Sequence, residues 1–183
     1  MEYTLIRSRR KTLSVEIKGG KVIVRAPERL ARTRIDDFLE SRRAWIEKKL
    51  EKSAELAAAG PITDEELRAL AESAKEYIPA HVRYYAPRVG VSFGRITIRA
   101  QRTKWGSCSG KGNLNFNCLL MLTPPEVRDA VIVHELCHLR EMNHSPRFYA
   151  EVRRVYPEYD KWNRWLRENG GAIIDRLERN ADL

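Results

Sequence analysis

The chain has 183 residues and a formal net charge of +9 at pH 7, from 34 Lys and Arg against 25 Asp and Glu, and this length allows one domain or two small ones with a buried core. No stretch approaches the roughly 20 consecutive apolar residues of a membrane helix, and the charged N-terminal segment lacks the apolar run of a secretory signal, so we expect no membrane partner. The three cysteines, Cys108, Cys118 and Cys137, include no C-x-x-C pair, which favours reduced thiols and a cytoplasmic location.

The N-terminal segment is predicted to form an antiparallel β-ribbon. Apolar and polar residues alternate over residues 3–7 and 12–17, and a further short run covers 21–25. Gly19 and Gly20 precede the last run and indicate a turn. The Ala-Pro pair after it ends the ribbon.

A helical pattern follows from residue 33 to about residue 58, with an apolar stripe in which Trp45 is expected to be a core anchor. This first part of the chain is also the most basic, because residues 1–53 carry 15 Lys and Arg against 8 Asp and Glu. Such a surface could contact the phosphates of a nucleic acid. The alternative is a solvated basic surface that only aids solubility.

Gly60-Pro61 interrupts the helical pattern and is the best candidate for a boundary between segments. We therefore predict a β-ribbon plus helix over residues 1–59 and a catalytic domain over residues 60–183. The two could also form one compact unit.

The second part is predicted to open with a helix. Thr63 and Glu66 read as a capping box, and the helix should extend to about residue 85, with Pro79 kinking or shortening it. Short strand-like runs separated by glycines follow, at 91–93, 95–100 and 113–118. A proline pair then opens an apolar helix of the kind buried in a core.

That apolar helix holds the strongest chemical signal, the stretch HELCHLREMNH at 134–144. His134 and His138 are about one turn apart, so both imidazoles project from one face and can reach one ion at about 2.0–2.1 Å. Glu135 lies about 100° around the helix, where it can touch a water at the metal without being a ligand. H-E-x-x-H on a helix is a strong indication of a zinc hydrolase.

A metal site that keeps an open position needs a third protein ligand, and His144 is the best candidate. A straight helix would carry it about 9 Å along the axis from His138. We therefore predict a helix break between Leu139 and His144. Asn143 can adopt the left-handed conformation at a helix end, and the serine and proline after His144 read as an N-cap and the first residue of a new helix.

Three imidazoles with an open fourth position favour Zn²⁺ as the cofactor, and Ni²⁺ or Co²⁺ could occupy the same site in vitro. Glu151 on the following helix is a reserve ligand. A structural zinc would instead fill its fourth position with Cys or His, and Cys108 and Cys137 are candidates for that.

A second constellation precedes the motif helix. Arg102, Lys104 and Trp105 stand in a segment that packs basic, aromatic, small and hydroxyl residues between two predicted strands. The glycine after the tryptophan indicates a close backbone approach or a turn. With Asn115, these three residues are our candidates for substrate binding.

The chain resembles the YgjP-like metal-dependent hydrolases, which belong to the zincin group with the WLM and SprT-like metallopeptidases. The resemblance rests on T-K-W-G-S-C-S at 103–109, N-x-N at 115–117, P-P-E-V at 124–127, V-I-V-H-E-L-C-H-L at 131–139 and N-H-S-x-x-F at 143–148. The Ala-Pro pair at 26–27 and A-W-I-E-K-K-L at 44–50 extend it over nearly the whole chain. Lys104 stands where the family usually has Arg, and Tyr149 where it usually has Trp.

The resemblance implies an α+β fold of the small zincin-like metallopeptidase type, with the motif helix packed beneath a sheet. It also implies a zinc ion held by His134, His138 and His144, with Glu135 catalytic. The first functional hypothesis is a metallopeptidase whose peptide or protein substrate pairs with the edge of that sheet.

Two alternatives stay open. The first is a metal-dependent nucleoside triphosphate pyrophosphohydrolase, in which Arg102 and Lys104 hold phosphates. The second is a nucleic-acid-binding module with a structural zinc. Glu135 argues against it, and a purely structural site usually fills its fourth position with Cys or His.

Overall fold

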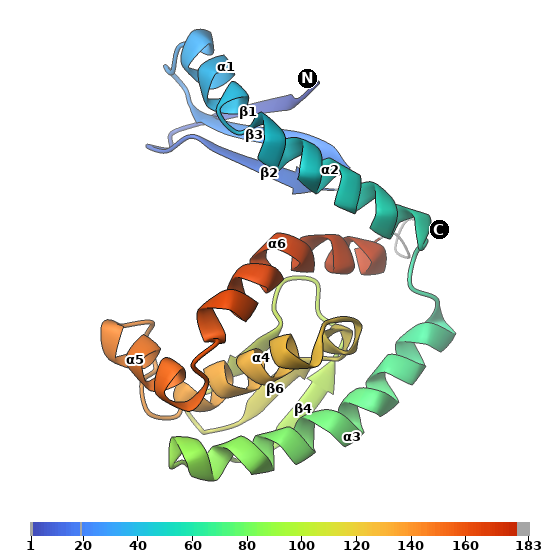
Figure 1. Cartoon of the computed structure of the whole chain (residues 1–183), viewed down its shortest axis with the longest axis vertical. Helices are drawn as coiled ribbons and strands as arrows, with labels where there is room; N and C mark the ends of the chain where they lie inside the picture. Colours follow the sequence, from blue (N-terminus) through green and yellow to red (C-terminus); the bar gives the residue numbers. More distant parts are fainter. Residues whose placement is uncertain (1, 19, 179–183) are drawn as a thin grey trace. The chain divides into compact units, whose positions relative to one another are not determined.

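The computed structural model describes residues 2–18 and 20–178, and the chain divides into two compact units, Met1–Pro61 and Ile62–Leu183 (Figure 1). Each unit has a hydrophobic core of its own. The fold is α+β, as predicted. Among the described residues, no helix combines the length and apolar character needed to cross a membrane.

The N-terminal unit contains a three-stranded sheet of β1 (Thr4–Ser8), β2 (Ser14–Lys18) and β3 (Lys21–Pro27). β3 lies in the middle and pairs antiparallel with β2, as predicted for the ribbon. β1 pairs with the other side of β3 and runs parallel to it. The sequence does not reveal this direction, because side chains alternate in the same way in parallel and antiparallel strands. Val22, Val24 and Ala26 of β3 point inward and are buried.

Two helices, rather than the predicted single one, pack on this sheet: α1 (Arg32–Glu40) and α2 (Arg43–Ala58). The break follows from Ser41, whose hydroxyl donates to the carbonyl of Phe38 at 2.7 Å and thereby competes with the helical bonds. The prediction for Trp45 was also wrong, because this side chain is 40% exposed, and Ile46 beside it is the buried residue.

The C-terminal unit opens with the long helix α3 (Asp64–Val89). Thr63 caps it by accepting a hydrogen bond from the backbone N–H of Glu66 at 3.1 Å, as predicted. α3 contains Pro79 and ends at Val89, four residues beyond the predicted end at about residue 85. Burial of its apolar stripe outweighs the backbone hydrogen bonds that Pro79 and Pro87 cannot donate. Gly90 ends the helix with a φ of +77°, the left-handed conformation that favours glycine.

A second small sheet follows, made of β4 (Ile96–Arg99), β5 (Gly106–Cys108) and β6 (Leu114–Asn117). β6 lies in the middle, parallel to β4 and antiparallel to β5. The predicted runs 95–100 and 113–118 contain β4 and β6, whereas the run 91–93 forms no strand. β5 was missed because three residues are too few for a readable alternation.

The chain continues through the short helix η1 (Cys118–Leu122), α4 (Pro125–Cys137), α5 (Pro146–Val155) and α6 (Tyr159–Glu178). α4 is the central element of this unit and packs against α3, α5, α6 and β5 (Figure 1). Its side chains are buried almost all round, as expected for a helix inside a core.

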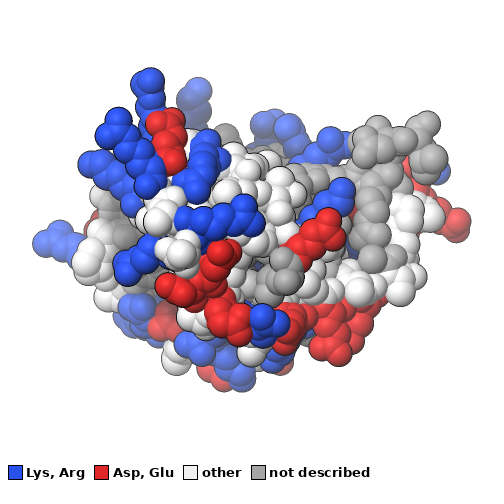
Figure 2. Space-filling model, turned by 90° about the horizontal axis from the view of Figure 1, so that it is seen from above, with Lys and Arg blue, Asp and Glu red and all other residues white. Residues whose placement is uncertain are grey.

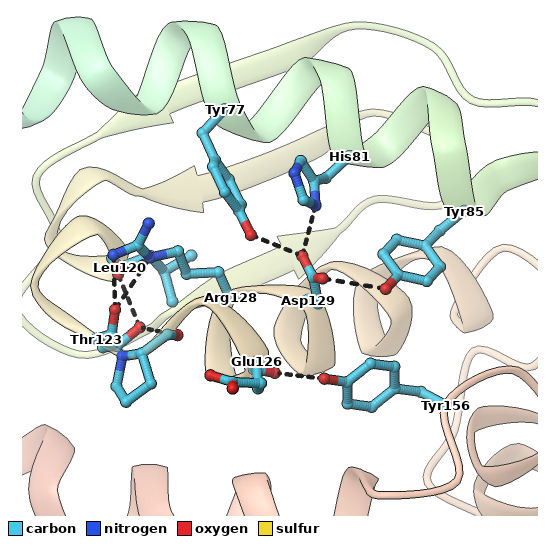
Figure 3. Close-up of polar contacts among 10 residues, drawn as sticks. Tyr77, His81, Tyr85, Leu120, Thr123, Glu126, Arg128, Asp129 and Tyr156 are labelled. Atoms are coloured by element: carbon cyan, nitrogen blue, oxygen red, sulfur yellow. Dashed lines mark hydrogen bonds and ion pairs between the residues drawn. The ribbon is translucent and has the colours of Figure 1, made fainter.

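A polar clamp fixes α4 against α3. Asp129 of α4 accepts hydrogen bonds from the hydroxyls of Tyr77 and Tyr85, both at 3.0 Å, and lies 2.7 Å from Nδ1 of His81. Figure 3 shows these three side chains reaching from α3 toward the one carboxylate. Because three donors spaced along α3 meet one residue of α4, the clamp fixes how α4 is rotated and therefore where its functional face points.

Candidate metal centre and adjoining pocket

The helix that carries the histidines ends at the second of them. α4 stops at Cys137, and His138 occupies the C-cap with a right-handed conformation. The predicted helix break therefore exists but comes earlier than predicted. The role given to Asn143 was wrong, because no non-glycine residue in the described part of the chain has a positive φ.

The turn after α4 leads directly into α5, which begins as predicted. Ser145 caps α5 by accepting a hydrogen bond from the backbone N–H of Phe148 at 3.2 Å, and Pro146 is its first residue. This short return brings His144, at the end of the turn, back over α4.

The three histidines point their Nε2 atoms toward one another. Nε2 of His134 lies 3.2 Å from Nε2 of His138 and 3.1 Å from Nε2 of His144. Tetrahedral zinc with bonds of about 2.0–2.1 Å separates its nitrogen ligands by roughly 3.3 Å. The donor set therefore fits one divalent ion held by three imidazoles, and it is the one such group of His, Cys, Asp and Glu found among the described residues.

Each of the two helical histidines has its other ring nitrogen occupied. Nδ1 of His138 donates to the carbonyl of Glu141 at 3.1 Å, and Nδ1 of His134 lies 2.8 Å from the hydroxyl oxygen of Tyr159. These contacts leave the Nε2 lone pairs free to bind a metal. Burial, with the neighbouring imidazoles, lowers the pKa of His134 to about 3, and burial lowers the pKa of His138, so both rings are neutral at pH 7.

Phe148 packs against all three imidazoles, with ring centroids 4.8 Å from His134, 4.4 Å from His138 and 5.0 Å from His144. It is fully buried. Tyr159 and Phe148 thus hold the ligands in place, and the sequence reasoning had assigned neither a role. Tyr159 lies 25 residues from its histidine, on another helix, so no spacing rule connects the two.

Glu135 lies against the backbone of β5. Its side chain is buried, and a Cβ added to Gly106 would lie only 2.7 Å from the Cγ and Oε1 atoms of Glu135. The close backbone approach that the sequence predicted at this glycine is confirmed. Burial raises the pKa of Glu135 to about 8, and the positive charge of Lys104 opposes this rise.

The backbone of β5 is open on the side away from β6. The carbonyl of Trp105 accepts a hydrogen bond from the backbone N–H of Asn117 at 2.9 Å. Because bonded and unbonded pairs alternate along an antiparallel ladder, the N–H and C=O groups of Gly106 and Cys108 point away from β6. Among the described residues no strand pairs with that edge.

A pocket adjoins Glu135 and His134 between α4 and α6. Of the four residues predicted to bind substrate, Lys104 and Trp105 line it. Arg102 is exposed and Asn115 donates from Nδ2 to the hydroxyl of Ser107 at 3.4 Å, and neither belongs to the pocket lining.

The other candidate ligands have different partners. Glu151 accepts hydrogen bonds from Arg140 at 2.9 Å and Arg154 at 2.7 Å, and it lies outside the histidine group. Cys137 is fully buried in the core, and Cys108 is partly buried on β5. Neither cysteine is part of the histidine group.

Comparison with protein families assigns the chain to a family of metallopeptidases. A family model described as "YgjP-like, metallopeptidase domain" matches residues 11–70 and 61–169 of the chain. The matched segments include β2, β3, α1 and α2 of the N-terminal unit and the three histidines. No curated protein shows significant similarity to the chain.

The solved structures that resemble the chain include two metallopeptidase zymogens, each similar to about half of it. The crystal structure of the metallopeptidase zymogen of Methanocaldococcus jannaschii jannalysin is 24% identical, with a TM-score of 0.43 over 49% of this chain and 92% of that one. The crystal structure of the metallopeptidase zymogen of Pyrococcus abyssi abylysin is 21% identical, with a TM-score of 0.45 over 50% and 93%.

Proposed function

The chain belongs to the YgjP-like metallopeptidase family, and from that premise we propose that it is a zinc-dependent peptidase. Family membership supports a metal-dependent peptidase, and the converging imidazoles support a divalent ion. In the proposal, His134, His138 and His144 hold the ion and Glu135 is the general base. Zinc is the metal that neutral imidazoles with an open fourth position suit best.

The observation that carries the proposal is the contact between Glu135 and the open edge of β5. An extended peptide can add to such an edge through main-chain hydrogen bonds, and Gly106 and Cys108 offer free N–H and C=O groups for them. Because Gly106 touches Glu135, a peptide bound along this edge would pass directly beside the carboxylate and the three imidazoles.

The chemistry divides between the ion and the side chains. When bound, the ion supplies a Lewis acid that polarises a peptide carbonyl and lowers the pKa of water. Glu135 accepts a proton from the attacking water and delivers it to the amine that leaves. Tyr159 holds the ring of His134 in the orientation that presents Nε2, and Phe148 packs against all three rings.

The two alternatives receive no such support. The family match gives no indication of nucleotide hydrolysis. Of the two residues that were to bind phosphates, Lys104 lines the pocket, but Arg102 is exposed and outside the lining. A structural zinc would need a fourth Cys or His, and no cysteine of the described residues joins the three histidines.

Replacing Glu135 with glutamine tests the proposed base. Glu135→Gln should retain the metal, because the ligands are unchanged, and should lose peptide hydrolysis by at least the roughly 100-fold that a positioned base contributes. The measurements are metal content and cleavage of an unfolded protein. Glu126→Gln, an exposed position in the first turn of the same helix, is the matched control.

Unchanged turnover in Glu135→Gln would remove this residue from the mechanism. The same metal-loaded protein should be incubated separately with nucleoside triphosphates. Release of pyrophosphate without any proteolysis would reject the peptidase and favour the nucleotide alternative.

A further inference from the structure

Most residues that line the pocket beside Glu135 have no part in binding the ion or in proton transfer. One wall is a stripe along α4 formed by Val127, Ala130 and Val131. These residues are spaced so that the stripe leads along the helix to His134. The pocket is therefore continuous with the site where a peptide bond would be cut. Small side chains at 127, 130 and 131 leave the space open.

The opposite wall comes from α6, where Tyr159, Trp162 and Leu166 face the α4 stripe at the same helical spacing. Trp105, from the segment before β5, forms a third side. Gly170 on α6 makes room for this indole, because a Cβ there would lie 2.9 Å from the Trp105 ring. The walls are thus predominantly aliphatic and aromatic.

The pocket is large enough for an aromatic ring. Its volume is about 210 Å³, whereas a cavity of roughly 150 Å³ is enough to bind benzene. An alanine side chain would leave most of this apolar space unfilled, which forfeits the favourable contacts of the walls.

The rings in the walls favour an aromatic occupant over an aliphatic one. Trp105, Tyr159 and Trp162 all line the pocket. Pairs of aromatic rings are stabilised beyond the apolar area that they bury, and a leucine side chain does not provide this contribution.

We infer that this pocket receives an aromatic side chain of the substrate, from a residue next to the peptide bond that is cut. The inference rests on the proposed peptidase function, and it names the class of substrate that the same site selects: unfolded or extended polypeptide with Phe or Tyr at that residue. The contacts with Trp105, Trp162 and Leu166 provide the selectivity.

Binding is tested first, because it does not depend on hydrolysis. The probes are the acetylated amides of phenylalanine, leucine and alanine, and the readout is the NMR resonance of the Trp162 indole N–H, assigned with Trp162→Phe. We expect the phenylalanine amide to shift this resonance with at least about tenfold higher affinity than the alanine amide. Equal responses to the two amides would overturn the inference.

Two variants fill the pocket from opposite walls, Ala130→Leu on α4 and Leu166→Trp on α6. Each should abolish the shift caused by the phenylalanine amide. Ala69→Leu, at an exposed position of α3, is the matched control and should leave it unchanged. Leu166 is half-buried, so its replacement keeps the test informative if Ala130→Leu fails to fold. Binding that persists in both folded variants would overturn the inference.

Cleavage of a peptide library then separates the inference from the proposed function. We expect kcat/KM to favour Phe or Tyr over Ala by about 100-fold at one residue next to the cut, and this ratio should fall toward 1 in the filled variants while cleavage of the alanine peptide continues. Cleavage without aromatic preference would overturn the inference and leave the peptidase proposal intact. If no peptide is cut, the peptidase proposal fails, and the binding data alone decide what the pocket receives.

Discussion

At the scale of single residues, the hydroxyl of Tyr159 is the contact that fixes the tautomer of His134. Nδ1 of His134 must carry the proton and donate it to this oxygen if Nε2 is to bind a metal. Tyr159 is itself buried, and burial is the main cause that raises its pKa, so the hydroxyl stays protonated at pH 7.

Tyr159→Phe keeps the ring and removes this contact. We expect the metal to bind about 10–100-fold more weakly, as is typical when a partner of a ligating histidine is lost. Competition with a chromogenic chelator measures this affinity. Tyr84→Phe, which removes a hydroxyl from an exposed ring, should change nothing, and an unaltered affinity in Tyr159→Phe would mean that the phenol does not orient His134.

At the scale of elements, the clamp between α3 and α4 links stability to the functional face. Asp129→Asn replaces one acceptor oxygen with an NH₂ group that faces the donors Tyr77, His81 and Tyr85 (Figure 3). We expect the free energy of unfolding to fall by about 1–3 kcal/mol, because donors are left unsatisfied at a largely buried site.

Urea denaturation monitored by circular dichroism measures this loss. The control is Asp160→Asn, which weakens an exposed ion pair with Arg153 and should have little effect. If the two variants lose equal stability, Asp129 does not act as a clamp.

A network of hydrogen bonds joins α5, the turn after α4 and the end of α3. Glu151 on α5 binds Arg140, after α4, and Arg154. These two arginines donate in turn to the carbonyls of Val89 and Arg88 at the end of α3, at 3.1 and 3.0 Å. The hydrogen bond from Arg154, together with the charge of both arginines, lowers the pKa of Glu151 below its ordinary value.

A lowered pKa means that this carboxylate stabilises the fold above its unfolded pKa and loses the contribution as pH falls through its folded pKa. Glu151→Gln should therefore lower the free energy of unfolding at pH 7 by about 1 kcal/mol at most, since both arginines are half-exposed and solvent screens the pairs. Urea titrations at pH 7 and at about pH 3 should show the wild type and the variant converging in acid. A difference that persists undiminished in acid would contradict the role given to this carboxylate.

At the scale of the whole molecule, basic residues are unevenly distributed. The N-terminal unit has a net charge of +6 and the C-terminal unit +3. Figure 2 shows many Lys and Arg side chains exposed on one face, with Asp and Glu side chains among them. This distribution keeps open the prediction that the basic region contacts nucleic acid.

Fluorescence anisotropy with a short DNA or RNA duplex tests this contact on the full chain. We expect binding at low salt whose affinity falls steeply as salt rises, because each phosphate contact releases counterions. Charge reversal at Arg9 and Arg29, two exposed residues of the N-terminal unit, should reduce the slope. Absence of binding at low salt would assign the charge to solubility alone.

What the sequence by itself determined is what depends on local spacing. The spacing of His134 and His138 on one helix, the return of the chain toward His144, the capping of α5 and the need for glycine at 106 all follow from geometry within a few residues. The sequence also located most helices and strands. It did not predict the break between α1 and α2, where the Ser41 side chain competes for a backbone hydrogen bond.

Only the tertiary structure decided which distant segments meet. The hydrogen bond from His134 to Tyr159, the pocket between α4 and α6, the clamp on Asp129 and the open edge of β5 all join residues from different elements. Their positions depend on how α4 is packed and rotated among its neighbours. Packing of this kind results from the burial of the whole core, which no periodicity along a single helix encodes.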